Sequence, residues 1–308
     1  MVVYETIEDV KNINASIVTI GSFDGVHRGH ETVIDKVLTL AYEKAVPSVI
    51  ISFDPHPQAI LNPSFRANQQ LITTEKKIEI FQNKGIDYLW LIPFNRTFSR
   101  ISADIFLREY LIEYFKPLDI IIGYDHHFGA NQEGNSQFLL SFQEVFRYNL
   151  FVVEPISLNN SKISSTSIRD LLKYGKVEEA NAMLGREYEM QGIVIKGAQL
   201  GQKIGFPTAN IKINTNTSPI LKKGVYCVDV EIDGEKHQGM CNIGMRPTFH
   251  DNGDLTIEAH IFGERNFELY NKPISLYFKQ FIREEKKYTN ADELILQLNL
   301  DRQICLSI

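Results

Sequence analysis

A glycine-rich segment near the N-terminus constrains the fold of this chain more than any other feature. Residues 21–30 have the sequence Gly-Ser-Phe-Asp-Gly-Val-His-Arg-Gly-His. They follow an apolar run typical of a β-strand at residues 17–20, and they precede apolar residues with helical spacing between positions 33 and 41. The pattern predicts a strand, a tight turn and the N-terminus of a helix in succession.

Such a turn is a candidate anion site. Glycine lets the backbone approach a ligand closely, and the amide groups and dipole of a helix N-terminus favour negative charge. His27 and His30 add donors at the same place, separated only by Arg28 and Gly29. This combination suits binding of a nucleoside triphosphate and stabilisation of charge during transfer at phosphorus. The alternative is a glycine turn with incidental histidines.

The first part of the chain alternates strand and helix patterns. The further expected strands are residues 48–52, 88–92, 120–122 and 151–153. Thr74 and Ser102 are the expected caps of helices that run to Lys84 and Phe115. Further helical segments are expected at residues 136–148 and 166–184. Apolar strands separated by helices of this length favour a parallel sheet covered on both faces.

Beyond residue 184 the pattern changes to short strands separated by turns. The expected strands are residues 189–195, 225–232, 238–243, 255–261 and 274–279. Asn290 and Glu293 have the spacing of a capping box that opens a last helix. The arrangement is typical of an antiparallel sandwich or barrel. We therefore expect two domains, residues 1–184 and residues 185–308.

Composition argues against several classes of protein. The chain has 308 residues, enough for two ordinary domains, and a net charge of −6, which disfavours non-specific nucleic-acid binding. No run approaches the roughly 20 apolar residues of a membrane span, and the acidic N-terminus does not resemble a signal peptide. Cys227, Cys241 and Cys305 are unpatterned and predict neither a disulfide framework nor a metal site. We expect a cytoplasmic protein that binds no nucleic acid or membrane and has no obligate protein partner.

A second polar motif at residues 164–169 has the sequence Ser-Ser-Thr-Ser-Ile-Arg. Hydroxyl side chains before a helical run commonly cap the helix. Hydroxyls at a helix N-terminus beside an arginine also suit a clamp on a triphosphate. The same residues are able to serve both roles.

Two further loops follow expected strands at the edge where open α/β sheets bind ligands. Residues 53–57 read Phe-Asp-Pro-His-Pro, which is either a structural turn or a ligand loop. Residues 123–129 read Gly-Tyr-Asp-His-His-Phe-Gly. The adjacent histidines His126 and His127 are poorly spaced to bind one metal together, so a metal site is the less favoured interpretation.

In the second part of the chain, residues 197–210 combine three glycines with Lys203 and suit a loop that folds over phosphates. Thr208 and Asn210 lie on alternate residues, so they point to one side if the segment is extended. Their neutral oxygens suit Mg²⁺ that also binds phosphate. The alternative is an ordinary Gly/Pro loop between strands.

Three further polar residues of this part allow two interpretations each. Glu258 is either a solvated strand residue or a group that accepts a proton. Arg246 either lines a site or pairs with a surface acid. Arg283 lies in a segment, residues 281–287, that by composition is a solvated charge run.

Taken together, these motifs resemble a known enzyme family. Residues 21–30 resemble the His-x-Gly-His signature of nucleotidyltransferases and, in full, the adenylyltransferase module of prokaryotic bifunctional riboflavin kinase/FAD synthetases. Residues 205–210, Gly-Phe-Pro-Thr-Ala-Asn, resemble the riboflavin kinase signature. The resemblance runs from about residue 19 to residue 302. This chain departs from the family pattern at Ser22, His126 and Gln202, and Lys203 is the alternative source of the positive charge usual at position 202.

The resemblance implies an α/β nucleotidyltransferase domain with a Rossmann-like parallel sheet, followed by a small antiparallel β-barrel domain with a C-terminal helix. It implies that the second domain phosphorylates riboflavin to FMN with ATP. The first domain would transfer AMP from a second ATP to FMN, giving FAD and pyrophosphate. Mg²⁺ is the implied cofactor of both steps.

The resemblance also assigns roles to individual residues. Glu258 is the implied general base of the kinase, and His27, His30 and Arg169 are the implied catalytic residues of adenylyl transfer. The implied ATP-binding residues are Gly21, Phe23, Asp24, Gly25, His27, His30, Ser164, Ser165, Thr166, Arg169, Gly197, Gly201, Lys203, Gly205, Pro207, Thr208 and Asn210. The implied flavin-binding residues are His56, Pro57, Pro93, Phe94, Asp125, Arg246 and Arg283. Thr208 and Asn210 are the implied Mg²⁺ ligands.

Two rival functions share some of these features. A fragment of an aminoacyl-tRNA synthetase uses similar histidine–glycine–histidine chemistry, but the acidic chain shows no tRNA-binding extension. A non-enzymatic flavin-binding protein would keep its affinity for flavin without needing Glu258, Thr208 or Asn210.

Overall fold

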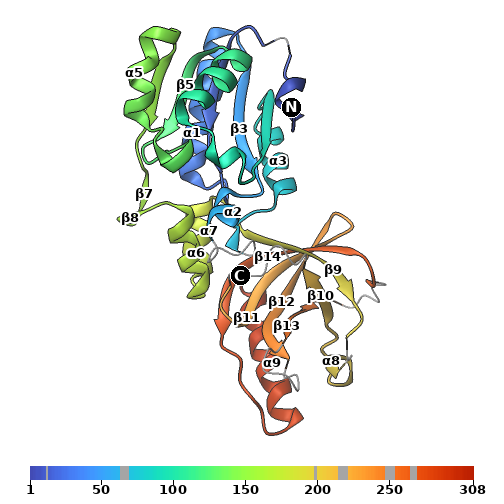
Figure 1. Cartoon of the computed structure of the whole chain (residues 1–308). Coiled ribbons are helices and arrows are strands. Elements are labelled where there is room, and N and C mark those ends of the chain that lie inside the picture. The colour runs from blue at the N-terminus through green and yellow to red at the C-terminus, as the bar shows by residue number, and fades with distance from the viewer. Residues whose placement is uncertain (12, 63–68, 198–199, 214–220, 247–253, 264–268) are drawn as a thin grey trace. The chain divides into compact units, whose positions relative to one another are not determined.

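The computed structural model describes residues 1–11, 13–62, 69–197, 200–213, 221–246, 254–263 and 269–308. The chain forms two compact units, Met1–Ser165 and Thr166–Ile308 (Figure 1). The expected domain boundary at residue 184 lies within the second unit, after α6 (Ser165–Lys173) and α7 (Val177–Leu184). That boundary stays a prediction.

The first unit is built on a six-stranded sheet whose neighbouring strands are parallel. The strands in spatial order are β1 (Val2–Tyr4), β4 (Tyr88–Pro93), β3 (Ser48–Asp54), β2 (Ser16–Ile20), β5 (Pro117–Gly123) and β6 (Asn149–Val153). The expected parallel sheet is confirmed, and β1 adds an edge strand that the apolar pattern does not indicate.

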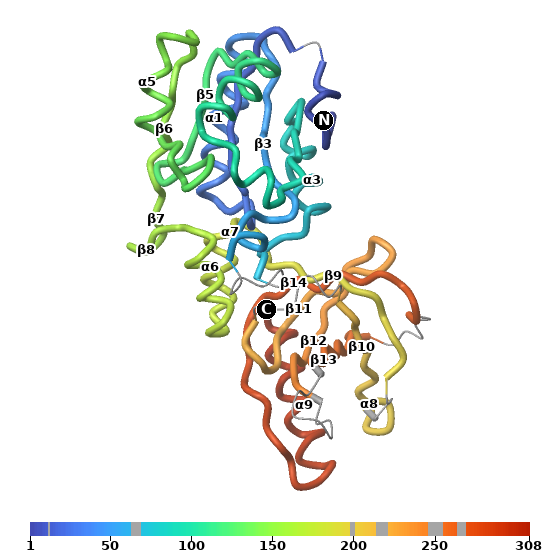
Figure 2. The backbone as a smooth tube through the Cα atoms, viewed as in Figure 1, coloured from blue at the N-terminus to red at the C-terminus, as the bar shows by residue number. Residues whose placement is uncertain are grey.

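Helices connect these strands, and their path can be followed in Figure 2. The helices are α1 (Arg28–Lys44), α2 (Pro57–Leu61), α3 (Thr74–Asn83), α4 (Ala103–Ile105), a π-helix (Phe106–Phe115) and α5 (Ser136–Phe146). The shorter elements are 3₁₀-helices at Ile7–Asp9, Phe98–Arg100 and Ala130–Gln132, and a hairpin of β7 (Ser157–Leu158) and β8 (Ser161–Lys162). Among the helices in the described ranges of the chain, none has the length and apolar character needed to cross a membrane.

Apolar residues of this sheet alternate between its two faces, and helices cover both faces. Ile17 and Ile50 pack against α1 and α3 on one face. Val18 and Ile51 pack against the π-helix and α5 on the other face. The two-sided burial predicted from the apolar strands is therefore confirmed.

Local capping residues set where the helices of this unit begin. Thr73, rather than the expected Thr74, caps α3 by accepting a hydrogen bond from the Lys76 amide at 3.2 Å. The Thr74 hydroxyl instead donates to the carboxylate of Asp54 at 2.8 Å, which diverts it from capping. Ser102 caps α4 as expected.

The second unit contains a closed antiparallel barrel. Its strands in spatial order are β10 (Ala209–Ile213), β13 (Asp254–Ile261), β12 (Glu235–Arg246), β11 (Gly224–Ile232), β14 (Pro273–Arg283) and β9 (Tyr188–Ile195). Its helices are α6, α7, α8 (Leu200–Lys203) and α9 (Ala291–Leu306). β10 pairs with both β9 and β13 and so closes the ring. Of the two all-β forms that the sequence allows, the barrel is the one observed.

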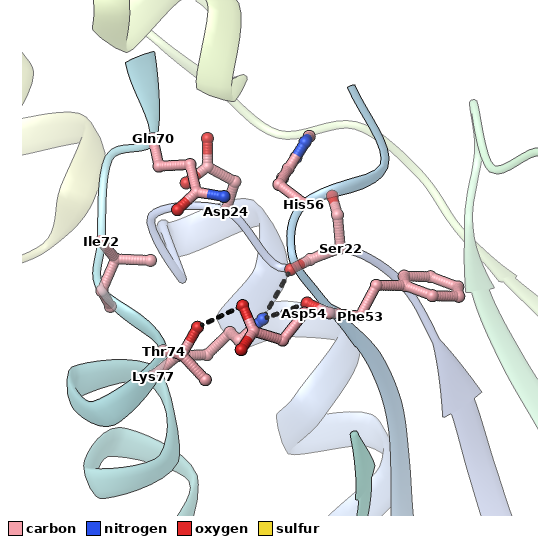
Figure 3. Close-up of a pocket in the computed structure, with 9 residues that line it drawn as sticks. All are labelled: Ser22, Asp24, Phe53, Asp54, His56, Gln70, Ile72, Thr74 and Lys77. Atoms are coloured by element: carbon pink, nitrogen blue, oxygen red, sulfur yellow. Dashed lines mark hydrogen bonds between the residues drawn. The ribbon is translucent and has the colours of Figure 1, made fainter. Parts of the chain in front are cut away.

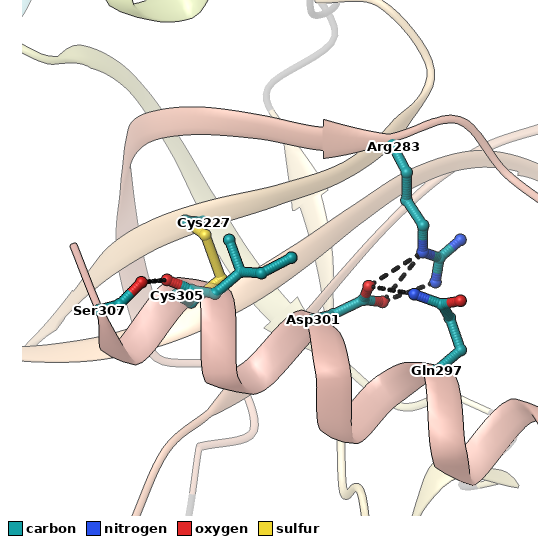
Figure 4. Close-up of a disulfide and its surroundings, with 7 residues drawn as sticks. Cys227, Arg283, Gln297, Asp301, Cys305 and Ser307 are labelled. Atoms are coloured by element: carbon teal, nitrogen blue, oxygen red, sulfur yellow. Dashed lines mark hydrogen bonds and ion pairs between the residues drawn. A yellow bond between two sulfur atoms is a disulfide. The ribbon is translucent and has the colours of Figure 1, made fainter.

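A disulfide and an ion pair help to fasten α9 to the barrel (Figure 4). A disulfide joins Cys305 of α9 to Cys227 of β11, with 5.1 Å between the Cα atoms. The buried Asp301 carboxylate accepts hydrogen bonds from Arg283 at 2.7 Å and 3.0 Å. The expectation of no disulfide is wrong. The two cysteines stand 78 residues apart in the sequence, and only the folding of α9 onto β11 brings them together.

Candidate active sites

The glycine-rich turn of the first unit joins β2 to α1. Three of its residues have positive φ angles, Phe23 at 49°, Gly25 at 84° and Val26 at 38°. The side chains of Phe23 and Val26 are buried in the core, and this packing holds the turn in its conformation. Backbone strain at non-glycine residues persists only where the surrounding structure enforces it, often at functional sites.

The two histidines of the turn lie against each other at the start of α1. Their rings stack with centroids 3.7 Å apart and planes 13° apart. Nδ1 of His27 accepts a hydrogen bond from the His30 amide at 3.3 Å, which caps the helix. Gly29 makes room for this arrangement, because a Cβ there would lie 3.2 Å from the His27 ring. The turn therefore places two imidazoles at the positive end of a helix dipole.

Asp24 ties the turn to two other segments of the first unit. Its buried carboxylate accepts a hydrogen bond from the Leu71 amide at 2.8 Å. Its backbone carbonyl accepts one from the Ser165 hydroxyl, also at 2.8 Å. The start of the hydroxyl-rich motif therefore lies beside the glycine turn. Gly21 leaves room within the turn, since a Cβ there would lie 3.1 Å from the Phe23 ring.

The hydroxyl-rich motif spans the junction of the two units. Ser164 and Ser165 end the first unit, whereas Thr166 and Arg169 belong to the second. Ser165 is the first residue of α6, and Arg169 lies about one turn further along the same helix. The motif begins a helix as expected, and its role in binding phosphate stays a prediction.

The two loops expected on the flavin side are neighbours, because β3 and β4 pair with each other. Asp54 pairs in register with Pro93, and the Phe94 amide donates to the Asp54 carbonyl at 3.0 Å. His56 caps α2 through Nδ1, and Pro57 is the first residue of that helix. The structure thus brings these four predicted residues to the C-terminal edge of the sheet.

Asp125 and His126 lie in the loop after β5. The Asp125 carboxylate accepts a hydrogen bond from Lys162 at 2.9 Å, which lowers the pKa of Asp125. His126 stacks on Phe128 with 5.8 Å between centroids, and burial lowers the pKa of His126 to about 4, so its ring is neutral at pH 7. Within the described ranges, no three histidine, cysteine or acidic side chains gather as metal ligands would.

A pocket opens at the C-terminal ends of β2 and β3 (Figure 3), where open parallel sheets bind ligands. Its lining residues are Ser22, Asp24, Phe53, Asp54, His56, Gln70, Ile72, Thr74 and Lys77. The pocket joins the predicted nucleotide turn to the predicted flavin loop. Sequence reasoning missed Lys77. The signal that identifies it is a lysine four residues before the buried Phe81, on the buried side of an amphipathic helix.

In the second unit the barrel brings together three predicted residues. Asn210 of β10 pairs in register with Glu258 of β13. The Thr208 hydroxyl donates to the Glu258 carboxylate at 3.3 Å. Asn242 of β12 faces Glu258 in register from the other neighbouring strand. A carboxylate, a hydroxyl and amide side chains therefore meet at one place on the barrel.

Close packing explains two glycines of the segment before β10, and backbone conformation explains a third. A Cβ at Gly197 would lie 2.1 Å from the side-chain nitrogen of Asn210, and one at Gly201 would lie 2.2 Å from the Phe206 carbonyl oxygen. Gly205 has a φ of 80°, which favours glycine. Lys203 ends α8 with an exposed side chain, so its charge is accessible to a ligand.

His260 holds the end of this segment in place and was not singled out by sequence reasoning. Its Nδ1 lies 2.8 Å from the Pro207 carbonyl oxygen, and its ring contacts that of Phe206 edge to face at 5.1 Å. Burial lowers the pKa of His260, so a neutral ring donates its Nδ1 proton to Pro207. Because Pro207 immediately precedes Thr208, His260 positions a residue of the candidate site.

The two arginines expected near the flavin end β12 and β14, the two strands that flank β11 in the barrel. Arg246 is the last residue of β12 and pairs in register with Asp254, and its side chain lies outside the described part of the structure. Arg283 is the last residue of β14 and binds Asp301, so it holds α9 (Figure 4). Contact of either arginine with flavin stays a prediction.

Two known protein families match the chain in succession. The FAD synthetase family matches residues 9–167, and the riboflavin kinase family matches residues 184–308. The first match contains the glycine turn and the flavin loops. The second contains the barrel with Thr208, Asn210 and Glu258.

Curated relatives match nearly the whole chain. The bifunctional riboflavin kinase/FMN adenylyltransferase of Listeria monocytogenes is 35% identical over 298 residues, which cover 97% of this chain and 93% of that protein. The protein of the same name from Bacillus subtilis is 34% identical and covers 94% of this chain and 90% of its own length. The one from Escherichia coli is 30% identical, with coverage of 92% and 90%.

A solved structure shares the fold over the full length. A macrolide-efflux protein from Streptococcus pneumoniae aligns with a TM-score of 0.90 and 28% identity, and the alignment covers 100% of this chain and 99% of that one. Efflux belongs to the name of that protein, whereas the family matches and curated relatives described above name flavin enzymes. The chain therefore belongs to the bifunctional riboflavin kinase/FMN adenylyltransferase family.

Proposed function

We propose that this chain makes FAD from riboflavin in two ATP-dependent steps. The riboflavin kinase domain transfers the γ-phosphate of ATP to riboflavin, giving FMN and ADP. The FAD synthetase domain transfers AMP from a second ATP to the phosphate of FMN, giving FAD and pyrophosphate. The observation that carries this function is the presence of both family matches in one chain, with relatives named for both activities over more than nine-tenths of its length.

In adenylyl transfer, the residues of the glycine turn would bind the triphosphate. The stacked His27 and His30 at the start of α1 would stabilise charge on the α-phosphate and the leaving pyrophosphate. Gly21, Phe23, Asp24 and Gly25 would supply the backbone around them. The phosphate of FMN is itself the nucleophile, so this step needs no nucleophile from the protein.

The outer phosphates of ATP would be held by the hydroxyl-rich motif. Ser165 lies beside the turn through its hydrogen bond to Asp24. Ser164, Thr166 and Arg169 would complete the clamp, with the guanidinium of Arg169 suited to two phosphate oxygens at once. The flavin would meet the neighbouring loops through His56, Pro57, Pro93, Phe94 and Asp125.

In the kinase step, Glu258 would accept the proton of the ribityl 5′-hydroxyl as it attacks the γ-phosphate. The hydrogen bond from Thr208 and the pairing with Asn210 support this assignment, because they place the carboxylate beside the segment proposed to hold phosphate. Gly197, Gly201, Lys203, Gly205 and Pro207 would form the ATP loop. Arg246 and Arg283 would border the flavin.

We propose Mg²⁺ as the metal of the kinase step, with Thr208 and Asn210 as its protein ligands. Two neutral oxygens from the protein fit Mg²⁺, which usually keeps waters and takes further oxygens from substrate phosphates. When bound, it would screen the phosphate charge that repels an attacking oxygen. The protein side chains would hold it next to Glu258 without a carboxylate cluster of their own.

We also propose the domain boundary near residue 184 and a cytoplasmic location. The boundary is supported by the riboflavin kinase match, which begins at residue 184. The location is supported by the use of ATP as co-substrate. Disulfides are rare in that compartment, so the bond between Cys227 and Cys305 calls for its own test, described below.

Chromatography of the flavins tests the proposed function directly. Incubation of the full chain with riboflavin and Mg-ATP is expected to yield FMN and then FAD. Incubation with FMN and Mg-ATP is expected to yield FAD without ADP. Unchanged riboflavin would contradict the kinase activity, and FMN without FAD would contradict the adenylyltransferase activity. Flavin binding without turnover would point to a non-enzymatic flavin-binding protein.

A further inference from the structure

Lys77 of α3 is a buried lysine in the pocket between the nucleotide turn and the flavin loop (Figure 3). The residue is 5% exposed, which is rare for lysine. Its Nζ donates to the Ser52 hydroxyl at 3.0 Å, the Phe53 carbonyl at 3.2 Å and the Ser22 carbonyl at 3.4 Å. A single ammonium thus joins the turn after β2 to the end of β3.

The number of donors matches the number of acceptors. A protonated lysine has three N–H donors, and each one meets a protein oxygen here. Burial of an ammonium is strongly unfavourable unless its hydrogen bonds are satisfied, so the three oxygens are what make the burial possible. Because protein oxygens engage all three donors, Lys77 affects bound substrates indirectly, by holding Ser22, Ser52 and Phe53 in place.

The segment around Lys77 contacts both sides of the pocket in other ways too. The Leu71 amide donates to Asp24 in the nucleotide turn at 2.8 Å. The Thr74 hydroxyl donates to Asp54 at the end of β3, also at 2.8 Å. Asp54 stands two residues before His56, one of the residues proposed to bind the flavin. Residues 71–77 therefore connect the two substrate sides, and Lys77 makes the most buried of these connections.

We propose that Lys77 is a positioning residue for adenylyl transfer, which fixes the ATP-binding turn at Ser22 relative to the flavin loop after Phe53. This inference rests on the proposed function of the FAD synthetase domain. Adenylyl transfer requires the FMN phosphate and the α-phosphate of ATP to approach in line, so the relative position of these two loops sets the reacting distance. A substitution that releases the loops would lower the rate of the chemical step strongly and would lower the affinity for the substrates less.

The protonation state of Lys77 offers a readout that a purely structural role would not give. Burial lowers the pKa of Lys77 to about 8, against the opposing effects of Asp24 and Asp54, and His56 is the other titratable group that lines the pocket. Above this pH the neutral amine has two donors for three acceptors. FAD formation is therefore expected to fall as the pH rises through about 8. Riboflavin phosphorylation by the same chain supplies the reference.

The test compares Lys77→Met, Lys77→Arg and the control Lys84→Met in the full chain. Lys84 lies at the other end of α3 and pairs with Glu31 and Asp35 at 3.2 Å and 3.3 Å. The Met variant at position 77 is expected to lower kcat for FAD formation from FMN by up to about 100-fold, with a smaller change in KM, because misplaced reacting groups cost rates of this order. The riboflavin kinase rates of Lys77→Met and of the control Lys84→Met should both stay within about twofold of the wild-type rate.

The Arg variant tests the same inference where the Met variant fails to fold. Arginine keeps its charge beyond pH 12, so Lys77→Arg should retain more activity than Lys77→Met, and its alkaline decline in FAD formation should vanish. A folded Met variant with wild-type FAD formation, or an Arg variant with an unchanged alkaline decline, would overturn the role of Lys77. Absence of FAD formation in the wild type would instead overturn the proposed function.

Discussion

The two units present different chemistry to the same co-substrate. In the first, a parallel sheet leads through a glycine turn to the start of a helix, where His27 and His30 stack. In the second, antiparallel pairing places Asn210 beside Glu258, with the Thr208 hydroxyl donating to that carboxylate. The proposed nucleophiles account for the difference. The phosphate of FMN is already an anionic nucleophile, so the first site needs hydrogen-bond donors that stabilise charge on ATP. The hydroxyl of riboflavin is a neutral nucleophile, so the second site needs a base.

Removal of the proposed base gives the largest expected effect. Glu258→Ala should lower riboflavin phosphorylation by about 10²–10⁴-fold, the usual contribution of a general base. Formation of FAD from supplied FMN should stay unchanged, because Glu258 belongs to the second unit and has no proposed role in adenylyl transfer. Separate assays of FMN and FAD formation measure both. Loss of both activities in folded protein would break the distinction between the two sites.

His30→Ala should produce the opposite pattern. FAD formation is expected to fall by about 10²–10³-fold, as is typical when a group that stabilises transition-state charge is removed. Riboflavin phosphorylation should continue and FMN should accumulate. Chromatography of the products from riboflavin shows this directly. Loss of FMN production in a folded His30→Ala protein would mean that the first unit takes part in the kinase step.

A smaller effect is expected from His260→Ala, which sharpens the account of the barrel site. Loss of the hydrogen bond to the Pro207 carbonyl frees the segment that carries Thr208. The kcat/KM of riboflavin phosphorylation should fall by about 10-fold, the rate equivalent of one neutral hydrogen bond. His237→Ala, at the start of β12 in the same barrel, is the matched control. Equal effects of the two substitutions would remove the positioning role from His260.

The disulfide should affect stability in the second unit more than catalysis in either. Cys305→Ser is expected to lower the free energy of unfolding of the barrel unit by about 2–4 kcal/mol, the usual contribution of a disulfide. Denaturant unfolding with and without reductant measures this: reductant should bring the wild type to the level of the variant and leave the variant unchanged. Titration of three free thiols in protein purified without reductant would show that the bond between Cys227 and Cys305 does not form.

The parts of the fold that local patterns determine were predictable from the sequence. The segment from β2 through the turn to α1 depends on residues 17–41, where apolar spacing, glycines and a helix cap all lie within a short stretch of sequence. The barrel was less determined, because sandwich and barrel share the same short strands. β10 (Ala209–Ile213) decides between them by pairing with both β9 and β13, and such distant pairing leaves no local pattern.

The residues missed by sequence reasoning owe their roles to distant partners. Lys77 follows Lys76 and looks like part of a charged surface, yet Ser22, Ser52 and Phe53 supply the oxygens that allow its burial. His260 is similar, since its importance comes from contact with Pro207, 53 residues earlier in the chain. In each case the missing information is which distant oxygen atom accepts a hydrogen bond from the side chain.

Mixing the two inactivated chains tests the central claim most directly. Glu258→Ala and His30→Ala proteins are incubated together with riboflavin and Mg-ATP, and the flavins are separated by chromatography. If two independent sites act in sequence, FMN made by the His30→Ala chain is converted to FAD by the Glu258→Ala chain, although neither protein alone makes FAD at an appreciable rate. A mixture of two folded variants that accumulates FMN without forming FAD would contradict the account.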